Sequence, residues 1–162
     1  MTPSPEMLAI SMGLDLPDFD RDGYYGAGYG TMKPYHRVGS LLFRSGHVAQ
    51  AGTTITHKGR LGADLTTAQG YAAARQTGIN VLGGIRQAVG SLDRVKSIVR
   101  TLNFVVCTPD YEDVHLVSSG LSDRRVEVFG PARGLGGRAT IGVMALAGGV
   151  CFETWATVEV ED

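Results

Sequence analysis

Two apolar runs near the C-terminus, residues 136–146 and 150–160, have the pattern expected of strands. Both are long, rich in β-branched residues and bounded by glycine. The short glycine link between them predicts an antiparallel hairpin. In the second run, alternate residues from Phe152 to Val160 are predicted to share a buried face, which leaves Glu153, Trp155, Thr157 and Glu159 on the other face.

The remaining pattern predicts further strands, two helices and two polar, glycine-containing loops. A helix begins after a cap at Asp64 or Thr66, buries apolar residues three and four apart, and ends at Gly90. The second helical region is expected to break near Ser118-Ser119-Gly120 and to restart at a Ser122 cap. The other predicted elements are strands at 34–38, 41–48 and 95–107, the second helical region at 110–129, and loops at 49–63 and 130–137.

Residues 1–30 are rich in Gly, Pro, Asp and Tyr and are predicted to form an extended arm with little regular structure. Its tyrosines could pack on the body of the protein or on a neighbouring subunit. The order of the elements after the arm predicts one α+β domain over residues 1–162, with two helices on one face of a mostly antiparallel or mixed sheet. The other face, with Trp155 and Thr157, is expected to contact another subunit.

Composition narrows the class of protein. The chain has 162 residues, of which 43% are hydrophobic and 19% charged, with a net charge of −1. This near-neutral balance argues against a broad nucleic-acid-binding surface. Cys107 and Cys151 lie in apolar runs and are interpreted as buried thiols, not a disulfide. The N-terminal residues lack a secretory signal pattern, and no apolar run could span a membrane, so a cytoplasmic location is expected.

Most patterns that could carry chemistry are absent from the sequence. The glycines at 26–30 lack the strand–turn–helix context of a phosphate-binding loop. The four histidines show no metal-ligand spacing, so no metal site is predicted. His47 could line a cavity, although a structural or solvent-exposed histidine is favoured. Arg138, the only charge in its run, and Glu153 remain, and they are interpreted either as a site for a carboxylate ligand or as an ion pair or rim arginine.

Several segments carry a resemblance that covers nearly the whole chain. They are Gly13 to Pro17, Leu42 to His47, Gly62 to Thr66 continuing through Tyr71 to Leu82, Gly90 to Val95, Ser122-Asp123, Glu127 to Gly130, and Arg138 to Glu153. In these segments the chain resembles the RidA/YjgF family of reactive-intermediate (enamine/imine) deaminases, also called L-PSP endoribonucleases, and most closely a subgroup with a longer N-terminal arm.

The resemblance implies a chorismate-mutase-like α+β fold, a homotrimer with ligand clefts between subunits, and hydrolysis of enamines and imines such as 2-aminoacrylate to 2-oxo acids and ammonia without a cofactor. It implies that Arg138 binds the substrate carboxylate and that Glu153 positions or activates water. Residues implied to bind substrate are Tyr35, Ser45, Gly46 and Thr140, together with Ser119 or Ser122 where the family commonly has an asparagine.

Two other functions remain open at this stage. Some relatives are described as endoribonucleases, for which a salt-dependent affinity for RNA is expected. A trimer that only binds or senses a small acid would use Arg138 for capture without turnover. Fold alone does not choose among these functions.

Overall fold

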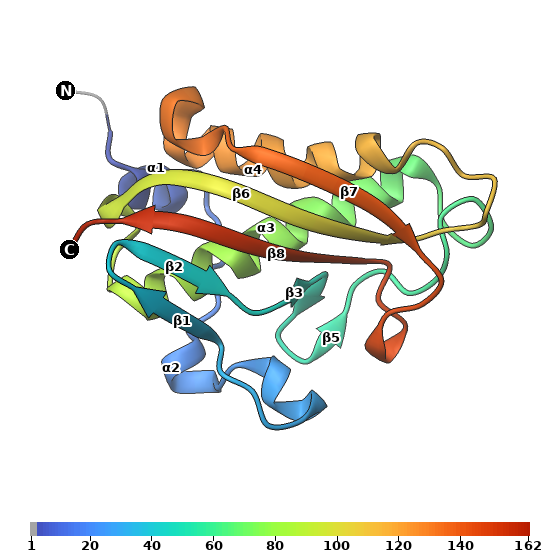
Figure 1. The fold of residues 1–162 in the computed structure, drawn as a ribbon, viewed down its shortest axis with the longest axis horizontal. Coiled ribbons are helices and arrows are strands. Elements are labelled where there is room, and N and C mark those ends of the chain that lie inside the picture. The colour runs from blue at the N-terminus through green and yellow to red at the C-terminus, as the bar shows by residue number, and fades with distance from the viewer. Residues whose placement is uncertain (1–2) are drawn as a thin grey trace.

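The computed structural model describes residues 3–162, and its centre is a mixed β-sheet with strand order β1-β2-β8-β6-β7 (Figure 1). The strands are β1 (Tyr35–Val38), β2 (Leu41–Arg44), β8 (Phe152–Val160), β6 (Val95–Val106) and β7 (Gly137–Val143). The short β3 (His47–Val48) pairs with the start of β8, while β4 (Gln50–Ala51) and β5 (Thr54–Ile55) form a small separate hairpin within the predicted loop. Only β6 and β7 pair in parallel; the other pairs are antiparallel.

The predicted hairpin between the last two strands is wrong. β7 and β8 lie on opposite sides of β6, so neither bonds to the other. The link Ala147–Gly149 is a short 3₁₀ segment with positive φ at Gly148 and Gly149, and it carries the chain past the end of β6. β7 instead follows α4 (Val114–Gly134) as the second strand of a β–α–β crossover, which is the connection that parallel strands require.

α3 (Thr67–Val89) begins and ends as the sequence predicts. Thr66 and Gln69 form a reciprocal capping box, and Gly90 closes the helix in the left-handed conformation. α4, by contrast, runs without a break through residues 118–120. A Cβ atom on Gly120 would meet the backbone of Tyr71, so the small residue permits close helix packing and does not interrupt the helix. The interruption of the helical dihedrals falls later, at Gly130.

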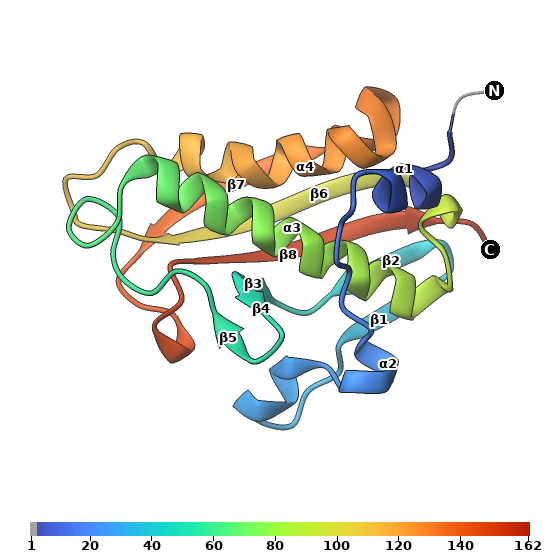
Figure 2. The ribbon, with the colours of Figure 1, turned by 180° about the vertical axis from the view of Figure 1, so that it is seen from behind.

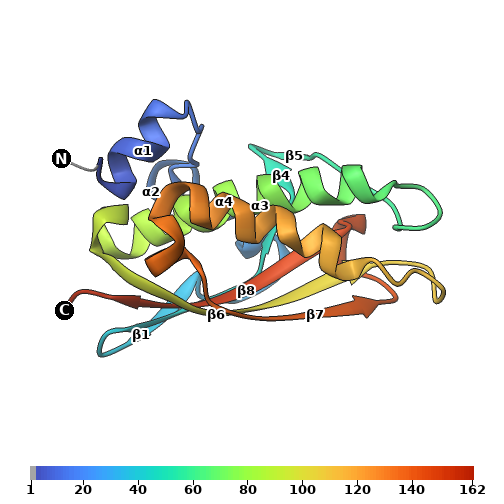
Figure 3. The same ribbon diagram turned by 90° about the horizontal axis from the view of Figure 1, so that it is seen from above.

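Both long helices cover the same face of the sheet (Figures 2 and 3). The core lies between them, and alternate residues of β8 from Phe152 to Val160 point into it, as predicted. No helix covers the opposite face, which Figure 3 shows as the lower side of the sheet. Large apolar side chains on that face remain exposed, including Phe43 at 40%, Ile141 at 47% and Trp155 at 52%.

The prediction of an irregular arm is wrong in part. The arm contains α1 (Pro5–Ser11), α2 (Phe19–Asp22) and a 3₁₀ turn, Tyr25–Tyr29. Ser4 and Asp18 accept backbone N–H groups at the starts of the two helices, a capping signal present in the sequence. No helix in residues 3–162 is long and apolar enough to cross a membrane.

Candidate functional site

A pocket of about 550 Å³ lies between the arm, the β1–β2 hairpin and the start of β8. Its size falls within the range of ligand pockets, roughly 300–1,000 Å³. It brings together four of the predicted site residues, Tyr35, Ser45, Gly46 and Glu153. The other lining residues are Tyr24, Tyr25, Gly26, Tyr29, Met32, Lys33, His36, Phe43, Arg44, Val48, Ala147 and Trp155. The residues predicted from the sequence therefore lie on the body side of this pocket, and none of them comes from the arm.

Among the described residues, Glu153 is the only acidic one that lines the pocket. Its side chain is half-buried on the face of β8 turned away from the helices, and its Oε1 accepts a 2.9 Å hydrogen bond from Nε1 of Trp155. Gly46 leaves the space beside it, because a Cβ atom there would lie 2.9 Å from Cδ of Glu153. Within the described residues, Oε2 has no hydrogen-bond partner and no cation pairs with the carboxylate. The carboxylate is therefore oriented by one bond and remains able to accept another.

Beneath the β1–β2 hairpin, an arginine occupies a buried position where an apolar side chain would be expected. Arg44 is 4% exposed, and it donates to the carbonyl of Gly84 at 2.5 Å and to Nε2 of His47 at 2.6 Å. The Tyr35 ring lies 5.6 Å from its guanidinium carbon. Among residues 3–162 no carboxylate pairs with Arg44, and burial lowers its pKa to about 10. The arginine therefore brings an unneutralised positive charge close to the pocket.

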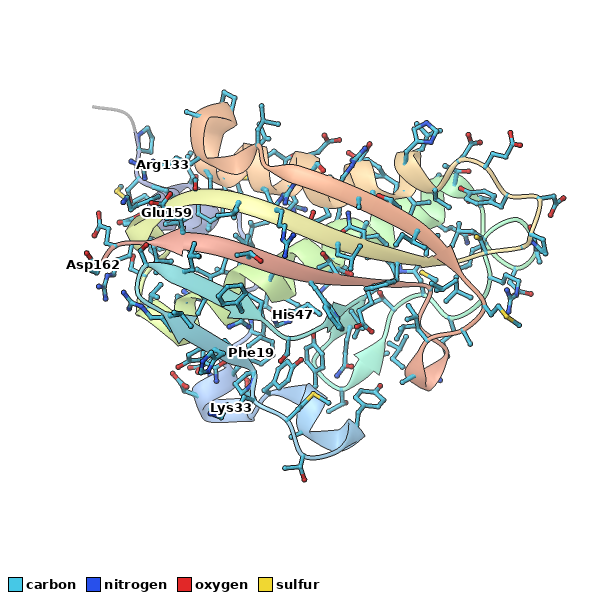
Figure 4. The ribbon with its side chains drawn as sticks, viewed as in Figure 1. Phe19, Lys33, His47, Arg133, Glu159 and Asp162 are labelled. Atoms are coloured by element: carbon cyan, nitrogen blue, oxygen red, sulfur yellow. The ribbon has the colours of Figure 1, made fainter. Side chains whose placement is uncertain are left out.

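His47 is structural, as favoured from the sequence. Its ring is fully buried, and burial followed by the charge of Arg44 holds its pKa well below the ordinary value. Because Arg44 donates to Nε2, the neutral ring carries its proton on Nδ1 and donates it to Oη of Tyr25 at 2.8 Å. Phe19, Tyr24 and Tyr25 pack around this ring, with centroids 5.7–5.8 Å away, which attaches the arm to the hairpin (Figure 4).

The other predicted residues gather at the opposite edge of the sheet. Arg138 on β7 is exposed and donates to Oγ of Ser122 at 3.1 Å and to Oγ of Ser119 at 3.4 Å, both on α4. Thr140, two residues along β7, shares a 2.7 Å hydrogen bond with Ser118 of α4. Both serines proposed for the pocket asparagine position thus contact the arginine. No acidic group within residues 3–162 pairs with Arg138.

A buried chain of polar side chains, missed from the sequence, supports this edge. Thr154 donates to Asn103 at 2.6 Å, Asn103 donates to Ser118 at 3.0 Å, and Ser118 bonds to Thr140. The chain crosses from β8 through β6 to α4 and β7. Buried polar side chains need hydrogen-bond partners. The presence of Asn103 and Thr154 at inward-facing positions of apolar strands was therefore the sequence signal for this buried chain.

Arg138 and Glu153 do not meet within one chain. Arg138 lies opposite Thr101 of β6 and Glu153 opposite Phe104 of β6, on different sides of that strand. The ion pair considered from the sequence is therefore absent. The predicted site is divided into two groups: the pocket beside Glu153, and the edge cluster of Arg138, Ser119, Ser122 and Thr140.

The described residues contain no group of three or more His, Cys, Asp or Glu side chains placed to hold a metal ion. Cys107 and Cys151 are free thiols, the first half-buried and the second buried.

Comparison with known proteins extends over most of the chain. Protein TCP17 of Trypanosoma cruzi is 36% identical over 124 residues, which are 76% of this chain and 78% of that protein. A structure described as a putative endoribonuclease from Shewanella oneidensis is 29% identical, with a TM-score of 0.88 over 98% of this chain and 100% of that one. RidA from an Antarctic Psychrobacter species shares the fold at 20% identity, with a TM-score of 0.55 over 81% of this chain and 89% of that chain.

The Shewanella structure matches nearly the whole chain, whereas the Psychrobacter structure covers about four fifths of it. The family model described as "YjgF/chorismate mutase-like, putative endoribonuclease" matches residues 6–152. The resemblance and the chorismate-mutase-like fold expected from the sequence are thereby confirmed, and the chain belongs to the YjgF/chorismate-mutase-like family.

Proposed function

We propose that this protein is a hydrolytic deaminase that converts reactive, carboxylate-bearing enamines and imines to 2-oxo acids and ammonia. The observation that carries the proposal is that the chain presents two charged groups, one basic and one acidic, and that within the described residues each lacks a partner of opposite charge. The exposed guanidinium of Arg138 has no acidic partner among residues 3–162, and the pocket carboxylate of Glu153 has no basic one. One group can bind a substrate carboxylate and the other can act on water.

The reaction needs little more than these two functions. An imine carbon is already electrophilic, and Arg138 would fix it by a bidentate interaction with the neighbouring carboxylate. Glu153 would accept a proton from water as the oxygen bonds to the imine carbon, and would return it to nitrogen. The resulting carbinolamine loses ammonia and leaves the 2-oxo acid. General acid–base assistance of this kind contributes about 10²–10⁴-fold.

We also propose that the complete site forms between copies of the chain in a cyclic homotrimer. Arg138 and Glu153 are too far apart along and across the sheet to act on one small molecule in the same chain. The uncovered sheet face carries exposed apolar side chains, with Ile141 outside the pocket and Phe43 and Trp155 at its margin. Burying the part of such a face that lies outside a ligand pocket against other copies is a common reason for cyclic assembly. The resemblance favours three copies.

The test is turnover of 2-aminoacrylate and its imine, generated in place by a pyridoxal-phosphate-dependent serine or threonine dehydratase. Faster release of 2-oxo acid when this protein is added, beyond the spontaneous rate, is the expected result. Binding of a 2-oxo acid without any rate increase would indicate a non-catalytic acid-binding protein instead. Cleavage of labelled RNA with no effect on the imine would indicate the endoribonuclease activity named in the family description.

A further inference from the structure

We infer that the arm makes this pocket selective for a ligand with a bulky aromatic side chain, in preference to the three-carbon 2-aminoacrylate. The inference rests on the proposed function for the class of ligand. Its own basis is the wall added to the pocket by the arm, with which we include residues 31–34 that join it to β1. Tyr24, Tyr25, Tyr29, Met32 and Lys33 all line the pocket.

The pocket has apolar groups on both sides. Tyr29 and Met32 from the arm are 47% and 45% exposed and face a space that Phe43 and Trp155 of the sheet also line. Aromatic side chains are large apolar surfaces that bind other rings in offset or edge-to-face geometry. A ligand whose only apolar part is a methylene can contact few of these groups, whereas a phenyl-sized side chain can contact several at once.

This wall is held in place before any ligand binds. Oη of Tyr24 donates to the carbonyl of Gly46 at 2.6 Å. The ring of Phe19 packs edge-on against the ring of Tyr24, with the two centroids 5.9 Å apart. Tyr29 reaches across to the link between β7 and β8, where its Oη would lie 2.8 Å from a Cβ atom at Gly148. A wall already ordered in the free protein costs little entropy on binding, so its contacts contribute to affinity.

The charges at the pocket favour an anionic ligand. Lys33 and the buried Arg44 line it, against the single carboxylate of Glu153 (Lys33 is labelled in Figure 4). The combination of basic groups and an aromatic wall fits a 2-imino or 2-oxo acid with an aromatic side chain better than it fits a neutral apolar molecule.

The experiment compares the binding of two stable 2-oxo acids, pyruvate and phenylpyruvate, to the full chain by calorimetry. We expect phenylpyruvate to bind about tenfold more tightly, an amount typical of added aromatic contacts. Tyr29→Ala and Met32→Ala should each reduce that preference several-fold, because they weaken the binding of phenylpyruvate more than the binding of pyruvate. Met7→Ala, an exposed apolar truncation on α1 outside the pocket, is the matched control. Tyr29 and Met32 are exposed, and circular dichroism melting will verify that both variants fold.

Equal affinity for the two acids, no binding of phenylpyruvate, or a preference that survives both arm variants would each overturn the inference. Its failure can be separated from that of the proposed function. If the arm variants abolish the preference but the protein does not turn over imines, the inference of an aromatic site stands and the proposed deaminase function fails. If the protein turns over small imines but shows no preference for phenylpyruvate, the deaminase function stands and the inference of an aromatic site fails.

Discussion

Arg138 and Glu153 lie on the two strands that flank β6, and their side chains leave the sheet on opposite faces. Arg138 contacts Ser119 and Ser122 on the helix side, whereas Glu153 bonds to Trp155 on the uncovered side. The two groups with the chemistry expected of one site therefore cannot act together in a single copy.

Replacing Arg138 should weaken ligand binding strongly without unfolding the protein. The side chain is exposed and makes only two hydrogen bonds, to serines, so its contribution to stability is small. Losing a charge-assisted pair of bonds to a carboxylate should weaken affinity for a 2-oxo acid by roughly 100-fold in Arg138→Ala. Arg138→Lys should recover little of it, because a point charge does not reproduce the planar fork.

Calorimetric titration with a 2-oxo acid, alongside a thermal melt, measures both effects. Arg133→Ala removes another exposed arginine, in the last turn of α4, and is the matched control (Figure 4). Full affinity in Arg138→Lys would exclude the bidentate role.

Glu153→Gln should lower kcat by about 10²–10⁴-fold while changing KM little, because the amide can bond but cannot carry a proton between water and nitrogen. Steady-state release of 2-oxo acid measures both constants. Glu159→Gln alters a carboxylate on the same strand and face that instead pairs with Lys96, and it should leave kcat unchanged. An unchanged kcat in Glu153→Gln would assign Glu153 to structure.

Gly46→Ala should impair turnover through Glu153 while leaving the fold intact. The new Cβ would occupy the space of the carboxylate, 2.9 Å from its Cδ, and the end of a flexible side chain can move away at low cost. We expect a fall in kcat approaching that of Glu153→Gln, with a melting temperature within a few degrees of the wild type. Gly28→Ala, where a Cβ meets nothing within 4 Å, is the control. Normal turnover in Gly46→Ala would show that the position of Glu153 is unimportant.

Mixing two inactive variants should restore activity if the site is shared between copies. After subunit exchange between Arg138→Ala and Glu153→Gln in equal amounts, about a quarter of the sites would combine an intact arginine from one copy with an intact glutamate from the next. The measurement is 2-oxo acid release before and after exchange, with the mass of the assembly followed by light scattering. A fully active monomer at micromolar concentration would refute both the trimer and the shared site.

His47 should make the protein less stable in mildly acidic solution. Its folded pKa lies well below the ordinary value of 6.5 because the ring is buried beside Arg44, so the unfolded chain binds the extra proton as the pH falls. This group alone should reduce the free energy of unfolding by roughly 1 kcal/mol between about pH 7.5 and about pH 5.5.

Denaturant unfolding at the two pH values measures this loss. His47→Gln has no titrating ring, so its free energy of unfolding should change by roughly 1 kcal/mol less than that of the wild type over the same interval. An identical loss in both proteins would mean that His47 is not buried in its neutral form.

The sequence alone determined the elements whose signals are local. The capped helix from Thr66 to Gly90, the alternation along β8 and the long strand β6 were predicted because periodicity, caps and glycine stops act within a few residues. The resemblance supplied the family, and with it the residues of the candidate site. The capping residues Ser4 and Asp18 were also a local sequence signal for the two arm helices, α1 and α2. The prediction missed these helices because it relied on the glycine-rich composition of the arm.

Only the tertiary structure decided which residues meet. It placed β6 between β7 and β8, kept α4 continuous past Gly120, and packed the arm against His47 to form one wall of the pocket. Each of these outcomes depends on contacts between segments far apart in the chain. Strand order follows from the crossover that a parallel pair requires, and helix continuity follows from close packing against α3. A local pattern does not specify either of these, because the energy that selects them comes from burial shared between distant residues.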